Sequence, residues 1–216
     1  MSVPHYSKSS TSRTRPSVQP RYTPRIYLDL QLDQRQLGRI YIKLFPESFP
    51  AGVENIYHLA LGDSIKTIST GTPRHPSSRQ IRRTLEGSIF YRCISGNYLQ
   101  GGDLYQNRGT SAATIWDDQP IPSELGEWAY PMDRSYLLIL VPHYDPETGD
   151  RYFDSTFAIT LQPALGDNLV GSMEEDHVVI GHVYRGDGFL RQIDAAIKPK
   201  LHGRTPLIKI SKSGVL

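Results

Sequence analysis

The chain is poor in cysteine and has no long apolar run. Its 216 residues include a single cysteine, Cys93, so no disulfide can form within the chain and nothing points to an oxidising compartment. No apolar stretch approaches the roughly 18 residues that a membrane span requires, and the first 25 residues lack the apolar centre of a secretion signal. We therefore expect a protein of a reducing intracellular setting, most simply the cytoplasm, with no membrane contact.

Acidic residues are absent from the first 25 positions, which contain five basic ones. This segment therefore carries a charge of +5, and because the whole chain is +2, the remainder is −3. The segment is also rich in Ser, Thr and Pro and offers almost nothing to bury, so we predict that residues 1–24 form an extended basic arm. Organelle targeting is an alternative, although the segment has no amphipathic face.

The motifs of several other functional classes are also missing. The histidines lack the paired spacing of a zinc site, and the chain contains neither a Gly-x-Ser-x-Gly elbow nor a Gly-Lys-Ser/Thr phosphate loop. We therefore expect no cofactor and no metal. Basic residues in the arm are not interleaved with aromatic ones, so an acidic protein surface is favoured over nucleic acid as a partner.

Alternating apolar residues predict most of the secondary structure. Residues 25–32 and 38–45 each place their apolar side chains on one face, which predicts an antiparallel hairpin. A spacing of three and four residues predicts helices at 51–62, ending at Gly62, and at 186–197. Further strands are predicted at 88–93, 98–100, 136–141, 155–162, 176–184 and 206–211. Many antiparallel strands with few crossover helices favour a mainly β fold, a closed barrel of about eight strands capped by two helices.

Residues 62–87 interrupt this pattern. They carry five basic residues against two acidic ones and show neither helical nor strand periodicity, so we predict an inserted basic loop with a charge of +3. The length of the chain fits one domain with appendages better than two domains. We therefore expect an arm at 1–24 and a single domain at 25–216 that contains the loop.

The stretch FYRCISGNYLQGGD, residues 90–103, resembles the site motif of the cyclophilins. In that family a Phe-His-Arg run leads through a short loop to a glutamine followed by Gly-Gly-Asp, and the spacing here is the same. Residues 37–62, 155–160, 177–195 and 209–214 are also similar to family segments, in the same order. The resemblance implies a cyclophilin fold over about residues 25–214, with 62–87 similar to the enlarged loop of the family's divergent-loop members.

The same resemblance implies a groove in which cyclophilins bind proline-containing peptides and accelerate cis/trans isomerisation. Arg92 stands where the family has its catalytic arginine, Gln100 where it has the neighbouring glutamine, and His177 where it has a histidine at the far edge of the groove. An arginine suits the chemistry because it stays charged and can donate to the prolyl nitrogen, which then loses its resonance with the carbonyl. The alternatives are an exposed strand arginine, a glutamine that holds a loop, and an edge histidine.

The apolar half of the implied groove is less well preserved. Asn97 and Ala158 replace two phenylalanines, and because burying one large side chain is worth about 1.5–3 kcal/mol, peptide binding should be weakened. Pro142 replaces an asparagine whose backbone N–H the family lends to the peptide, and proline has none. Tyr98 and Met173 are expected to refill part of the pocket. The other implied peptide-binding positions are Tyr91, in place of the motif's histidine, Val141, His143 and Thr156, while Ser172 stands where a rim tryptophan is expected.

Two functions follow from this pattern. The favoured one is a cyclophilin-fold interaction or structural module, part of a larger assembly, with weak or lost isomerase activity and a protein partner that presents an acidic surface. The alternative is an active peptidyl-prolyl isomerase that acts on proline-containing peptides. Arg92 and Gln100 permit activity, whereas Asn97, Pro142 and Ala158 oppose it.

Overall fold

The computed structural model describes residues 23–69, 78–109, 113–123, 130–164, 170, 176–198 and 204–216. Nearly all of the expected basic arm therefore lies outside the described residues. Over the described ranges the chain forms thirteen strands and two helices. In chain order they are β1 (Arg25–Leu32), β2 (Arg35–Leu44), α1 (Pro50–Leu61), β3 (Ser64–Ser69), β4 (Ser78–Arg83), β5 (Arg92–Ile94), β6 (Tyr98–Gly101), β7 (Ile121–Pro122), β8 (Leu137–Leu140), β9 (His143–Tyr144), β10 (Arg151–Phe153), β11 (Phe157–Thr160), β12 (Val178–Arg185), α2 (Asp187–Ile197) and β13 (Ile208–Val215).

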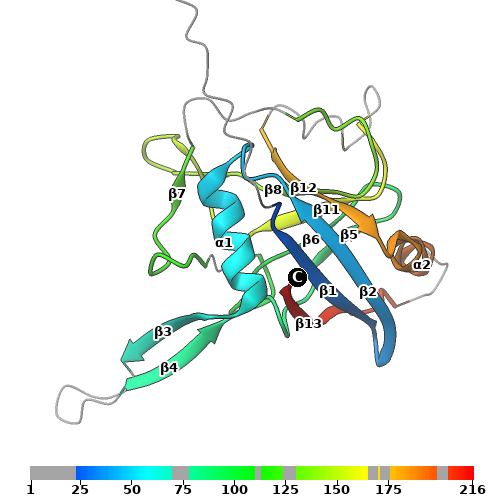
Figure 1. Ribbon diagram of the computed structural model, residues 1–216, viewed down its shortest axis with the longest axis horizontal. Coiled ribbons are helices and arrows are strands. Elements are labelled where there is room, and N and C mark those ends of the chain that lie inside the picture. The colour runs from blue at the N-terminus through cyan, green and yellow to red at the C-terminus, as the bar shows by residue number, and fades with distance from the viewer. Residues whose placement is uncertain are drawn as a thin grey trace, which may run out of the picture.

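Eight strands form one curled antiparallel sheet in the order β13-β1-β2-β12-β8-β11-β6-β5 (Figure 1). The mainly β prediction is confirmed, but the expected closure is wrong because the sheet is open between β13 and β5. The prediction of closure assumed a strand at 88–93, but β5 begins only at Arg92. Before β5, Ile89 forms an isolated antiparallel bridge with Lys209 of β13.

The predicted hairpin and both predicted helices are confirmed. In β1 and β2 the apolar residues of one face are buried, and the strands pair antiparallel. Helix α1 packs against β1 and β13, and α2 packs against β2. Gly62 ends α1 in the left-handed region, with φ of 69°, and its N–H donates to the carbonyl of His58 at 2.7 Å. Neither helix in the described ranges is long and apolar enough to cross a membrane.

The segment expected to be an irregular loop contains a hairpin instead. Strands β3 and β4 pair over six residues each and project from the body of the molecule (Figure 1). Arg83 fixes the base of this hairpin. Its side chain is 1% exposed, its Nη2 donates to Asp117 at 3.3 Å, and its Nε lies 3.2 Å from Asp118. Strands that are mostly polar show no alternation of apolar and polar residues, which is why the sequence pattern did not predict them.

Apolar residues pack on both faces of the central strands. The inner cluster fills the curl of the sheet and includes Phe157 and Ile159 of β11. Ala158, between them, points to the opposite face, where it joins a second set of buried residues that we call the outer cluster. The outer cluster consists of Tyr98, Met132, Leu137, Ile139, Ala158, Val170 and Val179. The sheet is therefore covered on the face where the sequence places the groove.

Candidate functional site

Strand register brings the two implied catalytic residues together. A turn at 95–97 joins β5 to β6, and Arg92 lies directly opposite Gln100 in the antiparallel pair. Ala158 of β11 is the partner of Gln100 on its other side. Residues opposite each other across strands share a face, so Arg92, Gln100 and Ala158 form a row on the outer face. The Arg92 side chain is exposed and makes no hydrogen bond or ion pair with any described residue.

Tyr91 takes part in this site through its hydroxyl. The Gln100 side-chain amide donates to Tyr91 Oη at 3.0 Å, which orients the amide. The ring packs against Gly109, where a Cβ would approach Tyr91 Cε2 to 2.7 Å. Burial raises the pKa of Tyr91 to about 12, so the phenol stays neutral at physiological pH. Tyr91 is therefore a hydrogen-bond partner for Gln100.

Asp103, the last residue of the Gly-Gly-Asp motif, organises the chain beyond the site. Its fully buried carboxylate accepts four backbone N–H bonds, from Tyr105, Gln106, Arg108 and Gly109, at 2.8–3.1 Å. The preceding Gly102 has φ of 96°, and a Cβ there would lie 2.0 Å from the carbonyl oxygen of Ser155. The motif thus holds residues 105–109 in place, including the glycine that contacts Tyr91.

Tyr98 fills the outer face beside the arginine. It is 3% exposed, belongs to the outer cluster, and lies beneath the Arg92 guanidinium, whose carbon is 5.7 Å from the ring centroid. Ala158 is 0% exposed in the same cluster. Met132 and Val170, from connecting segments, complete the cover. Within the described ranges, buried Tyr98 and Ala158 therefore occupy the outer face beside Arg92 and Gln100.

Both polar groups of the Asn97 side chain are hydrogen-bonded. Its side-chain amide donates to the Ser95 carbonyl at 3.1 Å, and its Oδ1 accepts from Gln162 Nε2 at 3.2 Å. Its backbone carbonyl also accepts from the Leu161 N–H at 2.7 Å. These hydrogen bonds link the β5–β6 turn to the end of β11. Asn97 therefore has a structural role in place of the apolar contact that a phenylalanine would make.

The segment 141–143 is turned toward the body of the protein. The Val141 N–H donates to the Thr156 carbonyl at 3.1 Å, and Pro142 has no N–H to offer. His143 Nε2 lies 2.9 Å from the Asp154 carboxylate and 3.2 Å from Thr156 Oγ1. The hydrogen bond with Asp154 raises the pKa of His143 and outweighs the effect of burial. His143 thus pairs with the buried Asp154 carboxylate and also forms a hydrogen bond with Thr156.

One further predicted site residue, His177, lies within the described residues. His177 is half-buried immediately before β12, which lies three positions from β6 in the order of the sheet. Met173 and Ser172 lie outside the described residues. Cys93, on β5 beside Arg92, is half-buried, and burial raises the pKa of its thiol to about 12. Within the described ranges, no group of three or more His, Cys, Asp or Glu could hold a metal ion.

Several residues that shape the outer face were not predicted from sequence. Leu137, Ile139 and Val179 cover it, and their strands are apolar at consecutive positions rather than at alternate ones. That pattern is typical of strands buried on both faces and could have been recognised. Nothing in the sequence around Met132, Val170 or the buried Asp154 indicated their positions.

Comparison with known proteins identifies the family of this chain. A model of the family "cyclophilin type peptidyl-prolyl cis-trans isomerase/CLD" matches residues 27–215, nearly all of the described fold. The chain belongs to the cyclophilin family. The family resemblance drawn from FYRCISGNYLQGGD is therefore confirmed.

Relatives of this cyclophilin include viral and plant proteins. It is 42% identical over 191 residues to the "structural PPIase-like protein L605" of Acanthamoeba polyphaga mimivirus, covering 88% of this chain and 81% of that one. It is 30% identical over 165 residues to the "peptidyl-prolyl cis-trans isomerase CYP21-1" of Arabidopsis thaliana, covering 76% of this chain and 62% of that one. The crystal structure of the mimivirus cyclophilin matches with a TM-score of 0.75 and 40% identity, over 90% of this chain and 89% of that one.

Proposed function

We propose that this cyclophilin is an interaction or structural module whose isomerase activity is weak or lost. The observation that carries the proposal is the outer cluster, in which Tyr98 and the covered Ala158 occupy the apolar half of the site. Catalysis requires binding energy that is realised in the transition state, and a proline ring that cannot be buried supplies little of it. The name of the mimivirus relative, a structural PPIase-like protein, is compatible with this role.

The backbone beside the site supports the same proposal. Pro142 cannot donate a hydrogen bond to a bound peptide, and His143 is engaged with Asp154 and Thr156. A peptide laid along this strand would therefore find fewer backbone partners. Both losses affect peptide binding, whereas the arginine remains in place.

An active isomerase is the second candidate, because Arg92 is favourably placed. Its exposed guanidinium has no polar partner among the described residues, and Gln100 lies beside it with its amide held by Tyr91. A cation aimed at the prolyl nitrogen is the group that the reaction needs. This hypothesis requires that Tyr98 move when a peptide binds.

A protease-coupled isomerisation assay on a short Xaa-Pro peptide tests the proposal. We expect a catalytic efficiency far below the roughly 10⁴–10⁸ M⁻¹s⁻¹ of ordinary enzymes, and Arg92→Ala should change it little. Arg185→Ala, at another exposed arginine, is the matched control. An efficiency inside that range that collapses with Arg92→Ala and survives Arg185→Ala would establish the active isomerase instead.

The proposal extends to a larger intracellular assembly that this module joins through its basic segments. The first 25 residues carry +5 and have little apolar content, and such segments gain order against a partner. The β3–β4 hairpin offers a second contact, with Ile65 57% exposed. Its charge is smaller than the sequence indicates, because Lys66 and Arg83 pair with Asp117 and Asp118. The positive charge that would bind an acidic protein surface therefore lies mainly in the N-terminal segment.

Deletion of residues 1–24 tests this attachment. The truncated protein should melt within a few degrees of the full chain, because the ordered sheet begins at Arg25, yet it should leave its assembly at moderate salt. A full-length variant with the four basic residues of 1–24 changed to glutamine should behave like the deletion, whereas Arg79→Gln on the hairpin should not. Retention of the truncated protein, or its failure to fold, would show that this segment is not the tether.

A further inference from the structure

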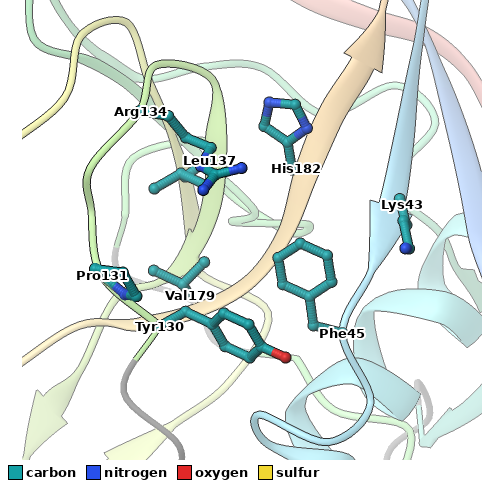
Figure 2. A pocket seen from close by; sticks show the side chains of 8 residues that line it. All are labelled: Lys43, Phe45, Tyr130, Pro131, Arg134, Leu137, Val179 and His182. Carbon is teal, nitrogen blue, oxygen red and sulfur yellow. The ribbon is translucent and has the colours of Figure 1, made fainter. Parts of the chain in front are cut away.

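A cavity of about 260 Å³ lies on the outer face of the sheet, away from Arg92 and Gln100. Residues of β2, β8 and β12 line it, whereas Arg92 and Gln100 lie on β5 and β6 at the far end of the sheet order. Figure 2 shows the Phe45 and Tyr130 rings along one side of the cavity and the Arg134 and His182 side chains across from them. The lining residues are Lys43, Phe45, Tyr130, Pro131, Arg134, Leu137, Val179 and His182.

The apolar wall of the cavity is firmly built. The Phe45 and Tyr130 rings stack with centroids 4.9 Å apart, and Tyr130 Oη donates to Glu47 at 2.7 Å, which fixes the second ring. Leu137 and Val179 belong to the outer cluster and form buried parts of the wall. A cavity of this size is just below the roughly 300–1,000 Å³ of sites for drug-sized ligands. It has room for one large apolar side chain.

The polar side of the cavity is basic. His182 is the strand partner of Lys43 on one side and of Leu137 on the other, so Lys43 and His182 lie next to each other on one face. Arg134 also lines the cavity, and its guanidinium lies 2.8 Å from the Asp133 carboxylate. Burial, together with the positive charge of Arg134, lowers the pKa of His182. The Lys43 ammonium has no ion-pair partner among the described residues, and none of those that line the cavity is acidic.

We propose that this cavity binds a protein segment in which an aromatic residue is followed or preceded by an acidic one. The aromatic side chain enters between Phe45, Tyr130 and Val179, and the carboxylate lies against Lys43 and His182 at the rim. A bound carboxylate gives the Lys43 ammonium, which has no ion-pair partner among the described residues, an opposite charge, and it favours the charged form of His182 beside it. The proposal rests on the proposed interaction role, for which it supplies a docking site separate from the peptide groove and from the N-terminal arm.

The test titrates the isotope-labelled full-length protein with acetyl-Gly-Asp-Phe-amide, using acetyl-Gly-Asn-Phe-amide as the matched control. The acidic peptide should shift the Leu137, Val179 and His182 resonances and bind about fivefold more tightly than the amide peptide, as expected for a partly exposed ion pair. It should also raise the pKa of His182, because a nearby carboxylate favours the imidazolium. Its affinity should therefore increase as the pH falls toward the pKa of His182 in the complex.

Two variants locate the site. Lys43→Gln, at an exposed position, should weaken the acidic peptide about three- to fivefold and leave the amide peptide unchanged, whereas Lys212→Gln on β13 should affect neither. Equal binding of the two peptides, no change at His182, or shifts at Arg92 and Gln100 in place of the cavity would overturn the proposal. Neither peptide contains proline and neither measurement involves the arm, so a negative result leaves the proposed function to its own tests.

Discussion

Replacing Tyr98 by alanine should raise the efficiency of proline isomerisation about ten- to a hundredfold while costing about 3–5 kcal/mol of stability. The ring is 3% exposed and lies directly below the Arg92 guanidinium. Its removal opens space where a proline ring could be buried, and burial of such a group contributes about 1.5–3 kcal/mol. Arg92 and Gln100 then have a substrate to act upon. Coupled assays and thermal unfolding measure the two effects.

A cavity elsewhere in the core provides the control. Phe90 is 4% exposed and belongs to the inner cluster, so Phe90→Ala should destabilise the protein by a similar amount without opening space beside Arg92. Tyr98→Leu, a smaller truncation, serves if the alanine variant does not fold. Equal activity in wild type, Tyr98→Leu and Tyr98→Ala would show that the filled outer face is not what limits catalysis.

The second large effect concerns Asp103, whose replacement by alanine should lower the free energy of unfolding by about 3–5 kcal/mol. The carboxylate is 0% exposed and accepts four backbone N–H bonds from residues 105–109. Hydrogen bonds to a charged group are worth about 1.5–3 kcal/mol each, and part of the loss is recovered as the loop opens to water. Denaturant unfolding measures the change.

Asp145 offers a matched comparison at the turn between β9 and β10. Its carboxylate accepts backbone N–H bonds from Glu147 and Thr148 at 2.8 and 2.9 Å, but the residue is only partly buried. Asp145→Ala should therefore lower the free energy of unfolding much less than Asp103→Ala does. If Asp103→Ala were no more destabilising than Asp145→Ala, the buried carboxylate would not be the organiser of residues 105–109.

The sequence predicted the features that depend on local periodicity and on motif spacing. Alternation in β1 and β2 and the glycine end of α1 follow from side-chain direction and helix termination, which are local properties. The family motif implied that Arg92 and Gln100 are neighbours, and the structure adds their register. The β3–β4 hairpin was not predicted because its two strands are mostly polar and show no apolar alternation. The prediction of a closed barrel was wrong because closure depends on where β5 begins, which the sequence pattern did not indicate.

The candidate site was predictable in its polar half and only partly in its apolar half. Gln100 and Arg92 share a hairpin of ten residues, so their juxtaposition needs no long-range contact. Two members of the outer cluster, Met132 and Val170, come from connecting segments outside the strands that carry the site. Likewise, the partner of His143 is Asp154, across the β9–β10 hairpin. Such contacts depend on how connecting segments fold over the sheet, and no residue pattern within them indicated this.

The central claim is that the outer face of the sheet is filled beside Arg92, and a peptide titration of the unmodified protein tests it most directly. Backbone and side-chain resonances of Arg92, Gln100 and Ala158 should be followed while a short Ala-Pro peptide is added to millimolar concentration. The filled face predicts no saturable shift at these three residues, because no pocket opens to receive the ring. Saturable shifts at all three, with micromolar affinity, would contradict the account and show that a proline peptide displaces Tyr98.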